Sequence, residues 1–270
     1  MTVMRLKLTA ADNTPRKQVV KNCRANTGYP SVTWGIGTHR PCIVVGGGVS
    51  TAESLDMLRE WAGDIFAIND TAAYLSRHGI KSYLFALDST RKLYEKGIFI
   101  QGAVFATRVH PSQFIYNDIR TWEMREDSVT GIWGGPSAAA RAPHLFLRMG
   151  YSEVYFLGID ASFSESTHVS GDVDVGYNDM LIVRVNGIDY LTNGGLLAQS
   201  EWMLETLQKY PNLLKNLSGG LFEAMLDNPE TWSVVAIGKD LKEQYESKGC
   251  TGFNKYNTDG RKIWQPSQAI

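Results

Sequence analysis

Cysteine is scarce in this sequence of 270 residues, which contains only Cys23, Cys42 and Cys250. The three thiols lie far apart and form no CxxC pair, and their number is odd. Such a pattern argues against a disulfide framework and is typical of reduced thiols in the cytosol. We therefore expect a cytoplasmic protein.

Long apolar runs and an excess of charge are missing as well. No window approaches the ~18 consecutive apolar residues of a membrane-spanning helix, and the N-terminal stretch lacks the apolar core of a signal peptide. The chain has 27 Lys and Arg against 28 Asp and Glu, for a net charge of -1. Because this balance gives no bulk attraction for polyanions, we expect neither a nucleic-acid partner nor a membrane span.

Short apolar runs that alternate with helical patterns dominate the middle of the chain. Strands are predicted at 42–45, 64–68, 82–87, 103–107, 153–160 and 213–218, and helices at 51–61, 71–80, 134–150, 194–211 and 238–249. Pro143 inside the 134–150 pattern predicts a kink or a later start of that helix. The alternation predicts an α/β fold: a Rossmann-like, doubly wound and mostly parallel sheet with helices on both faces.

The same patterns divide the chain into three parts. Residues 1–40 form an N-terminal arm with one short helix, and the arm packs on the domain or on a partner subunit of a homo-oligomer. Residues 41–228 form the Rossmann-like nucleotide-binding domain, and residues 229–270 a C-terminal helical extension packed on it. The stretches 109–132 and 161–195 interrupt the alternation, and structureless loops of that length are usually functional or mobile.

A triple-glycine turn follows the first strand, in "CIVVGGGVSTAESLDML". Glycines in such a turn let backbone N–H groups approach a phosphate, and the N-terminus of the next helix favours negative charge. Ser50 and Glu53 have the spacing of a capping box, which predicts a helix from Thr51. The turn has neither the lysine of a Walker A motif nor the GxGxxG spacing, and a structural turn without a ligand is the alternative.

Polar residues also follow the other predicted strands. Asn69 and Asp70 follow the second strand, and Asp88 follows the third. Ligands of doubly wound sheets bind outside the carboxyl ends of the strands. Each of these residues alone could be a helix cap or a turn residue. Together with the glycine turn, they predict a ligand site.

The loop after the fifth strand contains His168, with Asp172 and Asp174 beyond it. A histidine near a strand end can act as a general base, because its ordinary pKa lies close to working pH. Ligation of a metal by the three residues is an alternative, and a solvated loop is another.

Three blocks of the sequence, "VVGGGVSTAESLDML", "GGPSAAARAPHLFLRMGYSEVYFLGIDASFSESTH" and "LSGGLFEAML", resemble the signatures of the DUF115-type family. That family includes archaeal 6-hydroxymethylpterin diphosphokinases and bacterial flagellar motility accessory factors. Val49 stands where the family usually has proline. The same layout is similar to bacterial CMP-sialic-acid-dependent sialyltransferases, which have a glycine turn, a strand-terminal asparagine, a "GID" strand and a histidine base.

The resemblance implies a nucleotide-binding transferase, with glycosyl transfer from a CMP-type sugar donor to an unknown acceptor as the first expectation. The expected nucleotide-binding residues are Gly46, Gly47, Gly48, Ser50, Asn69, Asp70, Asp88, Arg108, Ser137 and Asp160, and the expected catalytic base is His168. This reaction needs no cofactor. The alternatives are pyrophosphoryl transfer from ATP to a pterin-like alcohol, with Mg²⁺ held by Asp70 and Asp88, and a non-catalytic nucleotide-binding module.

Overall fold

The main element of the fold is a seven-stranded sheet in the order β5-β4-β3-β2-β1-β6-β9, in which every pairing is parallel. The computed structural model describes residues 14–35, 39–90, 96–124, 132, 134–135, 137–163, 168–169, 180–237, 255–256 and 262–263. The strands are β1 (Cys42–Val45), β2 (Asp64–Ile68), β3 (Ser82–Ala86), β4 (Ile100–Ala106), β5 (Ile119–Trp122), β6 (Val154–Leu157) and β9 (Leu214–Asn216). The predicted Rossmann-like, doubly wound fold is thereby confirmed.

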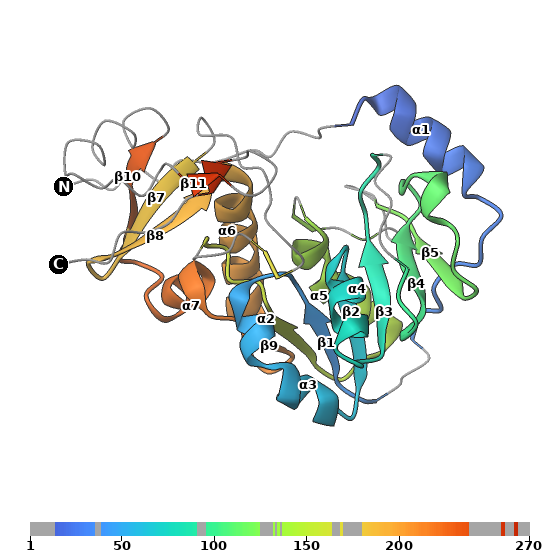
Figure 1. Ribbon diagram of the computed structural model, residues 1–270, viewed down its shortest axis with the longest axis horizontal. Helices are drawn as coiled ribbons and strands as arrows, with labels where there is room; N and C mark the ends of the chain where they lie inside the picture. The colour runs from blue at the N-terminus through green and yellow to red at the C-terminus, as the bar shows by residue number, and fades with distance from the viewer. Residues whose placement is uncertain are drawn as a thin grey trace.

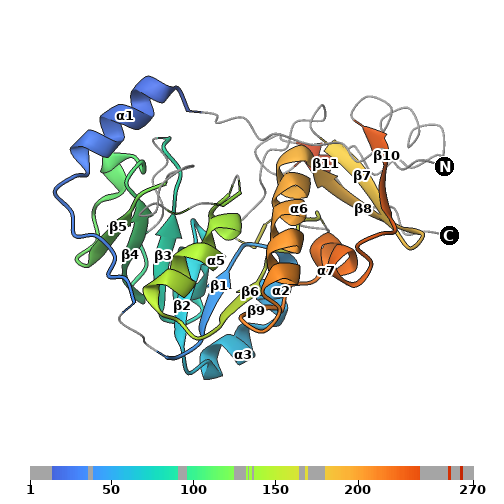
Figure 2. The ribbon, with the colours of Figure 1, turned by 180° about the vertical axis from the view of Figure 1, so that it is seen from behind.

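Helices cover both faces of this sheet (Figures 1 and 2). One face carries α2 (Val49–Glu53), α3 (Leu55–Glu60) and α4 (Thr71–Arg77), and the other carries α5 (Ala138–Met149) and α6 (Gly194–Lys209). Because both faces are covered, central strands are apolar throughout, and all four residues of β1 are buried. Instead of the single helix predicted over 51–61, two short helices meet at Ser54.

An aromatic cluster fixes α5 on the sheet. The ring of Phe146 in α5 stacks on Phe66 of β2 at 4.1 Å between centroids, and it meets Phe85 of β3 at 5.2 Å. All three are fully buried, and burial of such a side chain contributes about 1.5–3 kcal/mol. The helix begins at Ala138, later than the predicted 134, and it continues through the buried Pro143. Tertiary packing here outweighs a proline cost of about 3 kcal/mol.

A smaller antiparallel sheet lies beside the main one, in the order β10-β7-β8. It comprises β7 (Met180–Val185), β8 (Ile188–Asn193) and β10 (Trp232–Ile237), and packs with α6 and α7 (Gly220–Asp227) around a second apolar cluster. Part of the loop expected at 161–195 is therefore a hairpin. Its turn is Asn186-Gly187, both with positive φ (49° and 82°), which is a strong hairpin signal.

Two other predicted segments differ from the structure. Residues 232–237, expected in a helical extension, form β10, because they pair with β7 across a register shift between Val234 and Ala236. The interruption at 109–132 contains the short 3₁₀ helix Pro111–Gln113 and the edge strand β5. The helix expected at 238–249 lies outside the described residues. Two very short strands, β11 (Lys255–Tyr256) and β12 (Lys262–Ile263), pair with each other.

The N-terminal arm contains the expected helix, α1 (Arg16–Ala25). It lies beyond the carboxyl ends of β3 and β4, away from the antiparallel sheet (Figures 1 and 2). The three-part division of the chain stays a prediction. Within the described ranges, no helix is long and apolar enough to cross a membrane.

Candidate functional site

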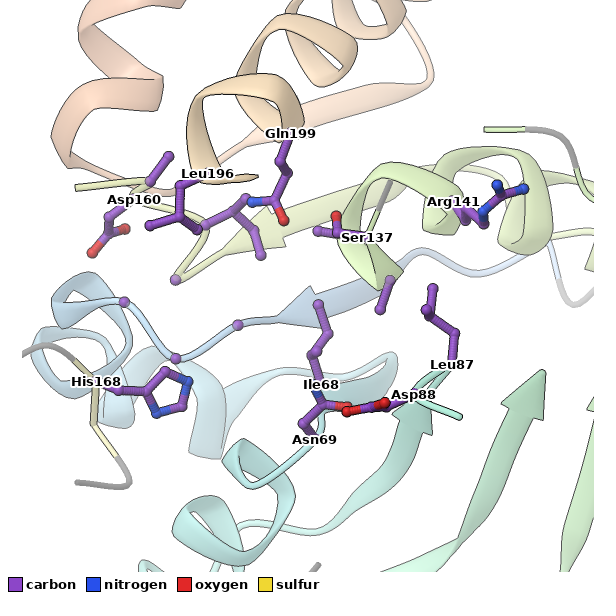
Figure 3. Close-up of a pocket in the computed structure, with 18 of the residues that line it drawn as sticks. Ile68, Asn69, Leu87, Asp88, Ser137, Arg141, Asp160, His168, Leu196 and Gln199 are labelled. Carbon is purple, nitrogen blue, oxygen red and sulfur yellow. The ribbon is translucent and has the colours of Figure 1, made fainter. Parts of the chain in front are cut away.

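A cavity of about 570 Å³ opens at the carboxyl ends of β1, β2, β3 and β6 (Figure 3). Strand order reverses between β1 and β6, which is the usual ligand position in doubly wound sheets. Nine of the eleven predicted site residues line it: Gly46, Gly47, Gly48, Asn69, Asp88, Arg108, Ser137, Asp160 and His168. Ser50 and Asp70 are not among its lining residues.

The glycine turn is needed because the segment that follows β6 approaches it closely. A Cβ on Gly46 would collide with the carbonyl oxygen of Gly158, and one on Gly48 would collide with the carboxylate of Asp160. The N–H of Gly48 donates to the Gly158 carbonyl at 2.8 Å. The glycine turn thus connects the end of β1 to the end of β6, and it presents only backbone atoms to the cavity.

Ser50 and Asp160 form one structural unit. The N–H of Ser50 donates to Asp160 Oδ2 at 2.9 Å, and its hydroxyl donates to Oδ1. The same Oδ1 accepts from the N–H of Gly219 at 3.2 Å. The predicted capping box is wrong: Ser50 is the second residue of α2, Gly48 is the N-cap, and the carboxylate that serves the helix N-terminus comes from Asp160.

This arrangement changes the expected phosphate site. The N-terminus of α2 already faces a carboxylate, so it offers less to an anion than a bare helix end would. Among the described residues, no acceptor is found for the N–H groups of Gly47 and Val49. The N–H of Val49 is a further backbone donor at this turn, although Val49 does not line the cavity.

Asn69 carries two signs of strain at the end of β2. Its φ is 53°, in the left-handed region that non-glycine residues seldom adopt, and its Oδ1 is buried without a hydrogen-bond partner. Such a conformation costs of order 1–3 kcal/mol and is concentrated at functional sites. Asp88 follows the neighbouring β3, and its Oδ1 accepts from the N–H and the hydroxyl of Thr90, both at 2.9 Å.

Asp70 does not line the cavity, and its nucleotide-binding role stays a prediction. It occupies the N-cap position of α4 without a side-chain cap bond. Burial, together with the charge of Asp70, raises the pKa of Tyr116, in the loop between β4 and β5, to about 12.

Basic groups and the N-terminus of α5 form another wall. Arg108, after β4, donates through Nε to the hydroxyl of Ser89. Arg141 of α5 is buried, lines the cavity and donates through Nη1 to the carbonyl of Ile132 at 2.8 Å. Ser137 caps α5 by accepting from the N–H of Ala140 at 3.1 Å. A helix N-terminus beside two arginines favours an anion.

The sequence did not predict several lining residues. Arg141 and Gln199 come from helices α5 and α6, and Ser89 lies one residue beyond Asp88. The alanine-rich start of α5, "SAAARA", is the one signal for Arg141, because a lone arginine among alanines on a buried helix face needs a polar partner. No comparable sequence signal marks Gln199.

His168 lies next to the glycine turn, on the opposite side from α5 and α6 (Figure 3). A Cβ on Gly47 would occupy the position of the His168 ring, so the imidazole covers that glycine directly. The N–H of Val169 donates to the carbonyl of Gly47 at 2.9 Å and anchors the segment. Asp172 and Asp174, the other members of the suggested metal group, lie outside the described residues.

The residues proposed for Mg²⁺ differ in their relation to the cavity. Asp88 lines the cavity and Asp70 does not. Within the described part of the chain, no group of three or more His, Cys, Asp or Glu residues is arranged to hold a metal ion. The Mg²⁺ site stays a prediction.

No family model, curated protein or solved structure matches the chain. The proposal for its function therefore rests on the fold and on the geometry of the cavity.

Proposed function

We propose that this protein is a nucleotide-binding transferase that moves a sugar from a CMP-type donor to an acceptor. The observation that carries the proposal is the convergence at one cavity of the glycine turn, the ends of β2 and β3, the N-terminus of α5 and His168. The cavity volume, about 570 Å³, is in the range of small-molecule sites. Its lining is rich in polar groups that suit a nucleotide.

The phosphate of the donor would lie between the glycine turn and α5. The N–H of Gly47 would supply a donor on one side, and the N-terminus of α5 with Arg108 supplies positive charge on the other. When the bond from sugar carbon to phosphate oxygen breaks, CMP leaves with the electron pair. Fixed donors and cations around that oxygen stabilise the developing charge.

The nucleoside would contact the ends of β2 and β3. The buried Oδ1 of Asn69 can accept an N–H or O–H of the ligand, which would satisfy an acceptor that has no partner among the described residues. Both hydrogen bonds from Thr90 to Asp88 go to Oδ1, so Oδ2 of Asp88 would accept from a ribose hydroxyl. Both residues follow strands that are paired in the sheet.

His168 is the proposed catalytic base. Its imidazole would take the proton of the acceptor hydroxyl as the acceptor oxygen forms its bond to the sugar carbon. CMP departs on the other side of that carbon, so charge and protons balance without an added metal. The Mg²⁺-dependent alternative ranks second because only Asp88 of its two proposed ligands lines the cavity. The binding module would retain the nucleotide contacts without transfer.

The test is release of CMP from a CMP-activated sugar, with His168→Ala compared with His78→Ala as a matched control. His78 lies at the end of α4, bonds to the carbonyl of Tyr74 and does not line the cavity. We expect His168→Ala to lower turnover by ~10²–10⁴ with little change in CMP affinity. His78→Ala should behave like the wild type. A wild-type protein that neither binds CMP nor releases it contradicts the proposal.

A further inference from the structure

The buried polar face of α1 connects two loops that border the cavity. Asn22 is the one fully buried residue of this helix, at 1% exposure. Its Nδ2 group donates to the carbonyl of Ser89 and to the carbonyl of Arg108, both at 3.0 Å. Its Oδ1 accepts from Gln18 Nε2 at 2.7 Å. Each donor and acceptor group of the Asn22 side chain therefore has a hydrogen-bond partner.

The two residues that Asn22 joins are also joined to each other. Arg108 Nε donates to the hydroxyl of Ser89, so Asn22, Ser89 and Arg108 form a closed ring of hydrogen bonds. Ser89 and Arg108 both line the cavity. The β3–β4 ladder extends only to the pair Ala86–Phe105. Asn22 thus continues the connection between the two strands beyond the end of the sheet.

We infer that Asn22 is a positioning residue, which sets the distance between the loops after β3 and β4 and thereby holds the Arg108 guanidinium in the cavity wall. An arginine side chain has several rotatable bonds, and fixing it in advance lowers the entropy that a bound anion must otherwise overcome. Hydrogen bonds of a buried ring reinforce one another where water is excluded.

The chain contains a matched control one turn away. Asn26 is equally buried, and its Nδ2 donates to the carbonyls of Thr107 and Val109 at 2.8 and 2.7 Å. Both acceptors belong to one loop, so Asn26 anchors α1 without joining the β3 loop to the β4 loop. Comparison of variants at Asn22 and Asn26 therefore distinguishes the anchoring of α1 from the connection between the two loops.

The direct readout is the Hε proton of Arg108, observed as its ¹H–¹⁵Nε signal and assigned by its loss in Arg108→Lys. In the wild type this proton should exchange slowly with water, because it is bonded to Ser89. We expect Asn22→Leu to speed the exchange by ~10-fold, and Asn26→Leu by less than ~3-fold, because only the first removes the bridge. Equal effects of the two variants would reduce Asn22 to an anchor of α1 and overturn the inference.

Two further measurements make the test decisive. Fast exchange of this proton in the wild type would contradict the inference by itself, even if Asn22→Leu does not fold. The consequence for affinity rests on the proposed function: the Kd for CMP should rise by ~10-fold in Asn22→Leu and by less than ~3-fold in Asn26→Leu. If the wild type does not bind CMP, the proposed function fails, while the exchange rates still decide the role of Asn22.

Discussion

The imidazole of His168 lies directly against Gly47 of the glycine turn. Since a Cβ at position 47 would collide with the imidazole, Gly47→Ala must displace the ring. We expect Gly47→Ala to lower turnover by about as much as His168→Ala, and the double variant to be no worse than either single one. Gly28→Ala, where a Cβ meets open space, is the control. Additive losses in steady-state assays would show that the two residues act separately.

Asn69 combines a left-handed backbone with a buried acceptor that lacks a partner, which a purely structural residue would not need. Glycine adopts this φ freely, so Asn69→Gly should leave the free energy of unfolding unchanged or raise it by up to ~1 kcal/mol. CMP affinity should fall by ~5–10-fold, the size of one lost hydrogen bond.

The control for this substitution is Asn186→Gly in the β7–β8 turn, where φ is also positive. Urea unfolding and calorimetric titration are the two measurements. If Asn69→Gly lowers stability and spares affinity, Asn69 serves the fold and not the ligand.

At the scale of elements, Asp160 connects β6 to the start of α2 and the start of α7. Its buried carboxylate accepts from Ser50 N–H, Ser50 hydroxyl and Gly219 N–H. Asp160→Ala leaves these buried donors without their acceptor, and we expect a loss of about 2–4 kcal/mol in the free energy of unfolding. Asp56→Ala, an exposed carboxylate paired with Arg59, should change it by less than ~0.5 kcal/mol. Equal, small effects in urea unfolding would contradict the structural role.

The contact between α5 and α6 gives stability a pH dependence. Burial, followed by the charges of Lys209 and Arg141, lowers the pKa of His144. At acidic pH the unfolded chain therefore binds a proton at His144 that the folded chain does not. The contribution of neutral His144 to the free energy of unfolding is complete above the ordinary histidine pKa of about 6.5, and it is lost as pH falls through the lowered pKa of the folded state. We expect His144→Gln to flatten the decline of the urea midpoint between pH 7.5 and 5. An unchanged slope of the urea midpoint against pH would show that His144 does not cause the pH dependence of stability.

At the scale of the whole molecule, the parallel sheet was predictable and much of the smaller sheet was not. Strands β1 and β2 match their predicted ranges, because continuous apolar runs there are bounded by Gly, Asn or Asp. The β7–β8 hairpin was not predicted, although the apolar run MLIVRV and the Asn186-Gly187 turn mark it. Strand β10 gains its identity from pairing with β7, about 50 residues away in the chain.

In the candidate site, too, features set by local sequence could be predicted, and features set by long-range contacts could not. Residues at strand ends could be predicted, because parallel strands bring their carboxyl ends to one edge of the sheet. The pairing of Ser50 with Asp160 spans 110 residues, and sequence spacing suggested Glu53 as the partner instead. Arg141 and Gln199 enter the cavity from helices whose orientation is set by packing. The relation to the DUF115-type family and to the sialyltransferases stays a prediction.

The measurement that tests the central claim most directly is calorimetric titration of the wild-type protein with CMP and with ATP, each in EDTA and in Mg²⁺. We predict that CMP binds in EDTA with an affinity that Mg²⁺ does not improve, because backbone N–H groups, the N-terminus of α5 and Arg108 hold one phosphate without a metal. Asp88→Asn should weaken CMP binding only modestly. Binding of ATP alone, abolished by EDTA and restored by Mg²⁺, would contradict the glycosyl-transfer proposal and favour pyrophosphoryl transfer.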